Sequence, residues 1–399
     1  GSVYVINRNG IVFGAGSQVN VHTLIASSLD IGELGTDLSK RNDYFLKTGI
    51  ANLNSFSIYD EVGGAGTNLV AGEITVERGA SITAAVAKDI DPLGSGGSVY
   101  LFGANVHNSG AISADTGEIA MVAARTIDIV PHGFSVLPEA VLGRDDQGKL
   151  LTIRGAEFRI SQFASTYLPN GYPLASNYLS GTGAVTHDGL IDASRGIVVM
   201  NGDKISIGNP KDTNGAALKD AAGNLVQGVI SVDTSIARNS MVLLRAATSV
   251  TMDGVISSLP FDDGSTLPSG TSTGSTVQSF TPAYIEMSAQ STVTMGSNGL
   301  ISAPSAQVTL RAIDLGANAL GVYQTAADGS RPQRLFNQGQ VNGQGGNASE
   351  PLPNSSSAQT VLLAPGATID VAGLANVPLP ADYNFIPFAP RAMSARPGS

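Results

Sequence analysis

Asp188-Gly189-Leu190-Ile191-Asp192-Ala193 is one of four short runs that share a pattern and decide the fold. In each run, Asn or Asp and then Gly precede a short apolar strand that ends in a small residue. Asn and Gly tolerate positive φ, so the pattern predicts a tight corner before each strand. The other runs are Asn108-Ser109-Gly110-Ala111-Ile112-Ser113-Ala114, Asp253-Gly254-Val255-Ile256-Ser257 and Asn298-Gly299-Leu300-Ile301-Ser302-Ala303.

Two further strand patterns alternate with these runs. One of these, the second pattern, comes after each of the runs above, and the third pattern follows it after a bend of small residues. Most strands of both patterns alternate apolar and other residues with a period of two, which turns one face of each strand inward. The second pattern covers 118–122, 197–200, 241–244, 284–287 and 307–310, and the third covers 126–129, 204–207, 249–252 and 292–295.

Three short strands separated by bends predict one coil of a repeating stack. One coil cannot bury its inward row alone, but stacked coils pair strand on strand and share one core. The fold class predicted is therefore all-β, a right-handed parallel β-helix (solenoid) with extra-helical loops and hairpins. A set of β-sandwiches would need hairpin turns and large core aromatics, but aromatics make up only 6% of the chain and Trp is absent.

The composition favours strands and turns. Gly occurs 48 times in 399 residues, without the collagen period, and 42% of residues are hydrophobic, which excludes disorder along the whole chain. The net charge of −10 disfavours nucleic-acid binding. The absence of cysteine suits a chain that crosses a membrane unfolded, and it equally suits a cytosolic protein. No run is long and apolar enough for a transmembrane helix, so we expect no membrane insertion.

The coil pattern divides the chain. Residues 1–130 and 188–373 carry the coils, and 131–187, with several prolines and tyrosines, is the largest predicted excursion from the stack. We expect the chain to begin inside a larger domain, because its first residues already read as a strand and no signal peptide opens it. Shorter loops are predicted at 208–227, 259–282 and 317–358, and a linker-like tail at 374–399.

The residue types that carry catalysis or bind metals do not form a recognisable site. The histidines lack metal-ligand spacing, so we expect them to be solvated or locally hydrogen-bonded; they are His22, His107, His132 and His187. Asp145-Asp146 and Asp262-Asp263 read as turns, and Gly63-Gly64-Ala65-Gly66 has no following helix to hold phosphate. We predict no enzyme activity, cofactor or metal.

The enzyme alternative is a β-helix polysaccharide lyase or hydrolase. Such an enzyme needs paired carboxylates, or acids beside Arg or Lys, on adjacent coils. Asp128, Asp192 and Asp370 recur at related places and would make an acidic row if they stacked. Like charges stacked so closely would repel, so we expect them to be spaced apart.

The opening stretch carries a family resemblance. It reads Val3-Tyr4-Val5-Ile6-Asn7-Arg8-Asn9-Gly10-Ile11-Val12-Phe13-Gly14, and then Gln18-Val19-Asn20-Val21. It resembles the secretion domain of filamentous haemagglutinin-like exoproteins of two-partner secretion, whose signature is a strand, Asn-Pro-Asn-Gly, apolar residues and Phe-Gly. Arg8 stands where the family has Pro. The later run Gly97-Ser98-Val99-Tyr100-Leu101-Phe102-Gly103 is similar to a recurrent coil of the family.

The resemblance implies an export route and a partner. Family members cross the periplasm, are recognised by a dedicated outer-membrane transporter barrel, and fold outside. By resemblance, Asn7, Asn9 and Gly10 are the candidate recognition turn. The chain would then be the export module and stalk of a large surface adhesin of a Gram-negative bacterium, secreted or held at the cell surface. The front end of a contact-dependent toxin-delivery exoprotein is an alternative.

The excursion at 131–187 offers a second functional reading. Tyr167, Tyr172 and Tyr178 lie near prolines and leucines, and tyrosine clusters on loops are typical of recognition surfaces. One interpretation is therefore a binding surface for a host-cell or biofilm glycan or receptor. The other is a loop that packs on the coil flank and covers an apolar stripe. The sequence leaves both open.

Overall fold

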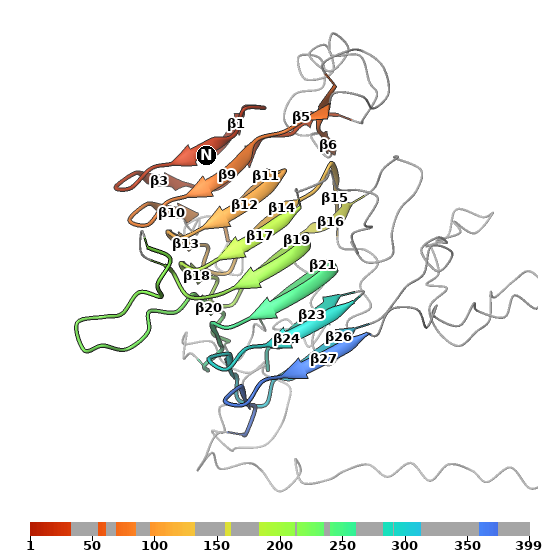
Figure 1. Cartoon of the computed structure of the whole chain (residues 1–399). Helices are drawn as coiled ribbons and strands as arrows, with labels where there is room; N and C mark the ends of the chain where they lie inside the picture. The colour runs from red at the N-terminus through yellow and green to blue at the C-terminus, as the bar shows by residue number, and fades with distance from the viewer. Residues whose placement is uncertain are drawn as a thin grey trace, which may run out of the picture.

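The strands form large parallel sheets in the computed structural model, and neighbouring strands come from successive repeats (Figure 1). The structure describes residues 1–32, 55–60, 69–84, 96–131, 156–160, 183–211, 214–234, 240–260, 282–289, 291–312 and 359–373. These ranges contain strands, bends and turns and no helix. The prediction of an all-β chain with parallel pairing is confirmed.

The parallel strands fall into three ladders, each of eight rungs in chain order within the described ranges. Along the chain, successive strands join ladder 1, then ladder 2, then ladder 3, and this order repeats. Ladders 1 and 2 form one sheet because β19 (Ile197–Ile207) and β21 (Met241–Met252) run through both. The first part of each lies in ladder 1 and the second part in ladder 2.

Besides these two long strands, each ladder has its own short strands. Ladder 1 contains β1 (Ser2–Ile6), β4 (Thr23–Ser27), β11 (Ser98–Gly103), β14 (Glu118–Ala123), β23 (Tyr284–Ala289) and β26 (Gln307–Ala312). Ladder 2 contains β2 (Ile11–Phe13), β9 (Glu73–Val76), β12 (Asn105–Asn108), β17 (Ala184–His187), β24 (Thr292–Met295) and β27 (Thr360–Leu363). Ladder 3 contains β3 (Gln18–Val21), β10 (Ser81–Ala84), β13 (Ala111–Ser113), β18 (Leu190–Asp192), β20 (Val229–Ser231), β22 (Val255–Ser257), β25 (Leu300–Ser302) and β28 (Thr368–Asp370).

The inward residues of the ladders stack into columns that form one core. In ladder 3 the second residue of each strand points inward, and the registered pairs form an almost uniform column. Its inner members are fully buried, and each contributes about 1.5–3 kcal/mol of burial free energy. The column is Val19, Ile82, Ile112, Ile191, Ile230, Ile256, Ile301 and Ile369.

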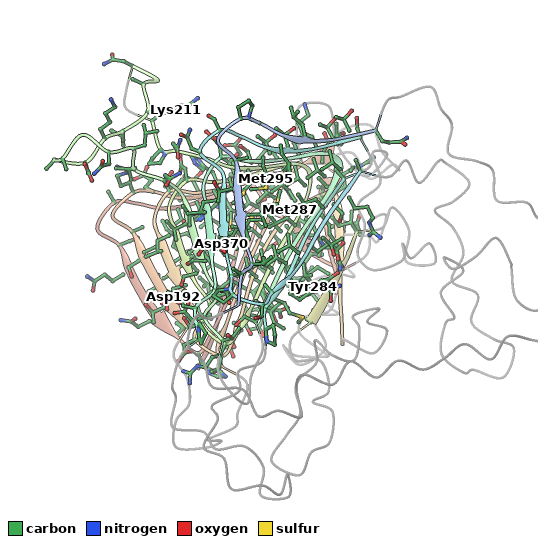
Figure 2. The ribbon with its side chains drawn as sticks, turned by 90° about the horizontal axis from the view of Figure 1, so that it is seen from below. Asp192, Lys211, Tyr284, Met287, Met295 and Asp370 are labelled. Carbon is green, nitrogen blue, oxygen red and sulfur yellow. The ribbon has the colours of Figure 1, made fainter. Side chains whose placement is uncertain are left out.

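Figure 2 shows the molecule turned by 90°, so that the ladders are seen from below. Met287 and Met295, both members of the core, lie among the strands. Lys211 lies on an arm that projects from the stack between β19 and β20. The arm is held by antiparallel bridges, Lys211 to Ala217 and Lys219 to Leu225. It falls within the predicted loop 208–227.

The glycines that precede the ladder 3 strands are required by close backbone packing and not, as the pattern predicts, by positive φ. Gly110, Gly189, Gly254 and Gly299 do not have positive φ, so the expectation of left-handed corners is wrong there. A Cβ on Gly110 would lie 2.7 Å from the Glu77 carbonyl oxygen of the preceding coil. The backbones of successive coils approach too closely at this corner to admit a side chain.

A second layer covers part of the outer face of ladder 1. It is an antiparallel sheet of β5 (Asp30–Ile31), β6 (Ser55–Ser57), β15 (Thr126–Pro131) and β16 (Ala156–Ile160). Phe56 and Phe158 pack edge-on against Phe102, with ring centroids 5.2 and 5.7 Å apart. A two-stranded antiparallel pair is formed by β7 (Tyr59–Asp60) and β8 (Leu69–Val70).

This layer corrects one strand assignment. Residues 126–129 were predicted as a coil strand, but β15 pairs antiparallel with β16 and β6 outside the ladders. The place in ladder 2 is taken by β17, which is inserted between β12 and β19. The alternation of Thr126-Ile127-Asp128-Ile129 suits any half-buried strand, so periodicity alone does not select the sheet.

Candidate functional site

The predicted recognition turn is well formed and lies at the corner between β1 and β2. The Gly10 amide donates to the Asn7 carbonyl at 3.0 Å, and the Asn7 side chain accepts from the Asn9 amide at 3.2 Å and donates to the Gly10 carbonyl at 3.0 Å. Gly10 has a φ of 102°, and a Cβ there would meet the Glu73 backbone. Asn7 therefore holds the turn, which has Arg8 in its second position.

The turn is also accessible. Asn7, Arg8 and Asn9 are exposed, and the Arg8 carbonyl accepts from the Gly72 amide of the next coil at 2.7 Å. The backbone is thus fixed on one side, while Asn7, Arg8 and Asn9 stay exposed to solvent on the other. The other predicted binding residues, Tyr167, Tyr172 and Tyr178, lie outside the described residues.

A buried polar pair occupies the corner between ladders 2 and 3. Asn108 and His187 are neighbours in one inward column of ladder 2 and are both fully buried. The Gly110 amide donates to Asn108 Oδ1 at 3.1 Å, which directs Asn108 Nδ2 to His187 Nδ1, also at 3.1 Å. His187 Nε2 lies 3.0 Å from the Val229 carbonyl oxygen and must donate to it.

These contacts define a neutral histidine with its proton on Nε2. Burial lowers the pKa of His187 to about 4, and the hydrogen bond to Val229 opposes that shift only in part. The expectation of solvated or locally bonded histidines is wrong for His187, whose partners lie on neighbouring coils. Aligning the repeats would have revealed the pair, because Asn108-Ser109-Gly110 then superimposes on His187-Asp188-Gly189.

Beside this pair, three polar side chains converge on the surface. Ser109 Oγ donates to Asp188 Oδ1 at 2.5 Å, and His107 Nε2 lies 3.0 Å from Ser109 Oγ and 3.3 Å from Asp188 Oδ1. Burial would raise the pKa of Asp188, but hydrogen bonds from His107 and Ser109 outweigh it and lower that pKa, so the carboxylate is ionised at neutral pH. No sequence pattern predicts a common role for these three residues.

The geometry of this cluster is not that of an activated nucleophile. In a catalytic triad the serine hydroxyl donates to histidine, and the acid orients the other ring nitrogen. Here the Ser109 proton points to the Asp188 carboxylate, so His107 cannot take it as a base. The same Nε2 of His107 faces both Ser109 and Asp188. The Asp188 carboxylate therefore accepts hydrogen bonds from both Ser109 and His107.

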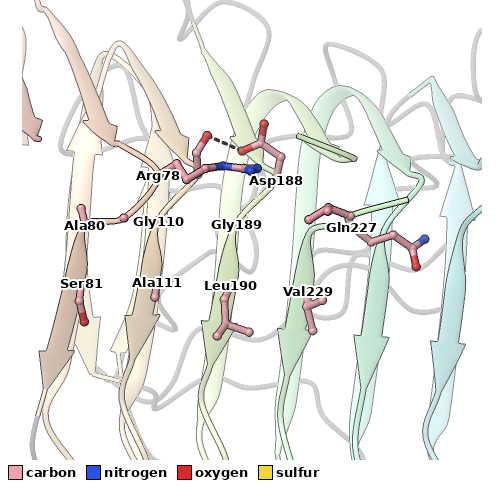
Figure 3. Close-up of a pocket in the computed structure, with 13 residues that line it drawn as sticks. Arg78, Ala80, Ser81, Gly110, Ala111, Asp188, Gly189, Leu190, Gln227 and Val229 are labelled. Carbon is pink, nitrogen blue, oxygen red and sulfur yellow. Dashed lines mark hydrogen bonds between the residues drawn. The ribbon is translucent and has the colours of Figure 1, made fainter. Parts of the chain in front are cut away.

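A groove of about 430 Å³ passes over this corner (Figure 3). Its lining includes Gly110 and Gly189, whose backbones are closely packed, and Val226 and Gln227 at the base of the arm. The other lining residues are Arg78, Gly79, Ala80, Ser81, Ser109, Ala111, Asp188, Leu190 and Val229.

Two buried carboxyl groups lie on the outer face of ladder 1. Glu118 accepts from the Tyr100 hydroxyl at 2.7 Å and from the Ala156 amide at 2.9 Å, while its Oε1 has no partner among the described residues. Burial outweighs both hydrogen bonds and raises the pKa of Glu118 to about 8, so the group is mostly neutral at pH 7. Its bond to Ala156 attaches β16 to ladder 1.

Glu286 is the opposite case. Burial alone would raise its pKa, but Arg245, whose guanidinium lies 3.1 Å away, outweighs burial and lowers it. Glu118 and Glu286 lie three rungs apart, which is about 14 Å at 4.8 Å per rung. The carboxyl groups of glycosidases lie about 5–9.5 Å apart, so the spacing of these two rungs does not favour a catalytic pair.

The other acidic residues do not stack either. Asp192 and Asp370 do share an outward column of ladder 3, but Ser231, Ser257 and Ser302 separate them. Asp128 lies on β15 in the antiparallel layer. The described ranges contain no group of three or more His, Cys, Asp or Glu side chains that could hold a metal ion. In the same ranges, no helix is long and apolar enough to cross a bilayer.

No protein-family model matches the chain, and no curated protein matches it.

Proposed function

We propose that the chain is the export module and stalk of a secreted surface exoprotein of the two-partner type, folded as a right-handed parallel β-helix. The observation that carries the proposal is the exposed Asn7–Gly10 turn at one end of three ladders that advance together in chain order. A stack of this kind projects a distant binding region from the cell surface without needing a catalytic site. The proposed location is the surface of a Gram-negative bacterium.

The stacked ladders also support a role in export. Each new coil buries its inward row against the coil before it, so folding can advance one coil at a time as the chain emerges. Refolding outside the membrane would make backward movement costly. The proposed partner is an outer-membrane transporter barrel that binds the turn before the coils fold.

Export of the full-length protein, with the transporter gene intact or deleted, tests this proposal. We expect the protein in the medium or on the cell surface only when the transporter is present. Asn7→Ala combined with Asn9→Ala should reduce export about tenfold. The control is Asn224→Ala, which changes an exposed asparagine in the projecting arm and should leave export unchanged. Undiminished export without the transporter would exclude the proposed route.

A second measurement separates recognition from folding. The purified turn variant should retain the thermal unfolding midpoint of the unaltered protein to within a few degrees, because one exposed turn contributes little to the core. A variant that unfolds much earlier and is also poorly exported would count against recognition by the turn.

A further inference from the structure

The groove over the corner of ladders 2 and 3 has the features of a ligand site that the export function does not use. We propose that it binds a neutral saccharide chain that lies along the stack, across the coils that contribute Arg78, Ser109 and Asp188. The residues that line the groove do not include those of the Asn7–Gly10 turn. The proposal does not depend on the route of export.

The first argument is the set of polar groups that the groove offers. Only Oδ1 of Asp188 is engaged by described side chains, so Oδ2 remains as an acceptor for a ligand hydroxyl. Arg78 provides several donors, and its side chain extends in the direction of Asp188 in Figure 3. No described side chain pairs with Arg78. A ligand with many hydroxyl groups can satisfy both residues.

The second argument is the apolar strip beside these groups. Leu190 is 45% exposed, and Ala111 and Val229 flank it on the neighbouring rungs. These three residues belong to the outward column of ladder 3 and line the groove. Sugar rings carry hydroxyl groups at their edges and C–H groups on their faces, so they match a strip of this kind next to polar groups.

The surroundings of the groove disfavour several other classes of ligand. A peptide that binds by strand addition would need an unpaired strand edge, whereas β13 and β18 are paired on both sides. Nucleic acids and polyanionic glycans are disfavoured, because the groove offers one arginine and also one ionised carboxylate, and the chain has a net charge of −10. A neutral saccharide needs no unpaired strand edge and carries no charge that the carboxylate would repel.

Calorimetric titration of the complete chain tests the site with defined probes. The probes are cellohexaose, maltohexaose and laminarihexaose, with an oligoguluronate of equal length as the anionic comparison. We expect at least one neutral hexamer to bind and to bind more tightly than the oligoguluronate. Asp188→Asn and Leu190→Asn should each weaken that binding about tenfold or more, a change of about 1.4 kcal/mol.

The matched control is Leu300→Asn, which changes the same outward column of ladder 3 beyond the groove and should leave affinity unchanged. Leu190 is exposed, so its variant keeps the core intact and tests the site even if Asp188→Asn disturbs folding. The proposal fails if none of the three neutral hexamers binds. It also fails if both groove variants bind normally, or if the oligoguluronate binds best.

Discussion

Two inward columns of the same stack differ in chemistry. The ladder 3 column is one valine followed by seven isoleucines, so each rung offers nearly the same surface to the next. The ladder 2 column is apolar except at Asn108 and His187, and it consists of Phe13, Val76, Asn108, His187, Ile207, Met252, Met295 and Leu363.

The two columns have different effects: the isoleucine column stabilises the stack, and the polar pair affects which strands lie in register. A uniform isoleucine column stabilises the stack but does not distinguish one rung from the next, since a shift by one coil restores the same contacts. Asn108 and His187 satisfy each other only when they are adjacent, because a lone buried amide or imidazole would lack a partner. We infer that the polar pair helps to specify which coils stack together.

The largest loss of stability is expected when an inner isoleucine of the ladder 3 column is removed. Ile230→Ala deletes a fully buried side chain between two isoleucines and leaves a cavity, so we expect a loss of about 2–5 kcal/mol in the free energy of unfolding. Denaturant titration measures the loss. A change below about 1 kcal/mol would mean that the column is loosely packed.

Acid should weaken the polar column and leave the isoleucine column unaffected. The pKa of His187 is 6.5 in the unfolded chain and about 4 in the folded one. Between these values the unfolded state binds the extra proton, so stability falls as the pH falls. The loss should reach about 3 kcal/mol by pH 4.

Comparison with His187→Leu isolates this effect. Glu118 has the opposite dependence, because its raised pKa stabilises the fold below about 4.5 and that stability is lost as the pH rises toward 8. Both proteins retain Glu118, so its contribution cancels in their difference. A difference that is constant from pH 6.5 to 4 would contradict the burial of a neutral His187.

A double-mutant cycle should show that the pair acts as a unit. Asn108→Leu leaves His187 Nδ1 buried without its donor and should cost about 1–3 kcal/mol. The double variant with His187→Leu as well should recover part of that loss, because two apolar side chains need no partner. Additive losses, measured by the same denaturant titrations, would mean that the residues act independently.

The smallest effect is expected at the end of the isoleucine column. Ile369 is 36% exposed on β28, so Ile369→Ala should cost about 1 kcal/mol or less. Hydrogen exchange of the β25 and β28 amides would locate the change. A loss as large as that of Ile230→Ala would show that the last rung is buried in solution.

Much of the coil pattern could be predicted because it is local. The alternation in Leu190-Ile191-Asp192 determines which side chain points inward, and the repeat of that pattern predicts a column. The predicted corners were placed correctly, although the glycines are required by close backbone approach and not by positive φ. Because alternation is a local signal, the pattern at 126–129 predicted a strand but not the strand with which it pairs.

The sequence by itself thus determined the strands, their inward faces and the candidate turn at Asn7–Gly10. Only the tertiary structure decided that Asn108 meets His187, that Ser109 meets Asp188, and that Arg78 and Leu190 line one groove. The physical reason is that these contacts join residues about 80 positions apart. Whether such residues are adjacent depends on how many residues are inserted between successive coils. Local sequence preferences do not encode that number.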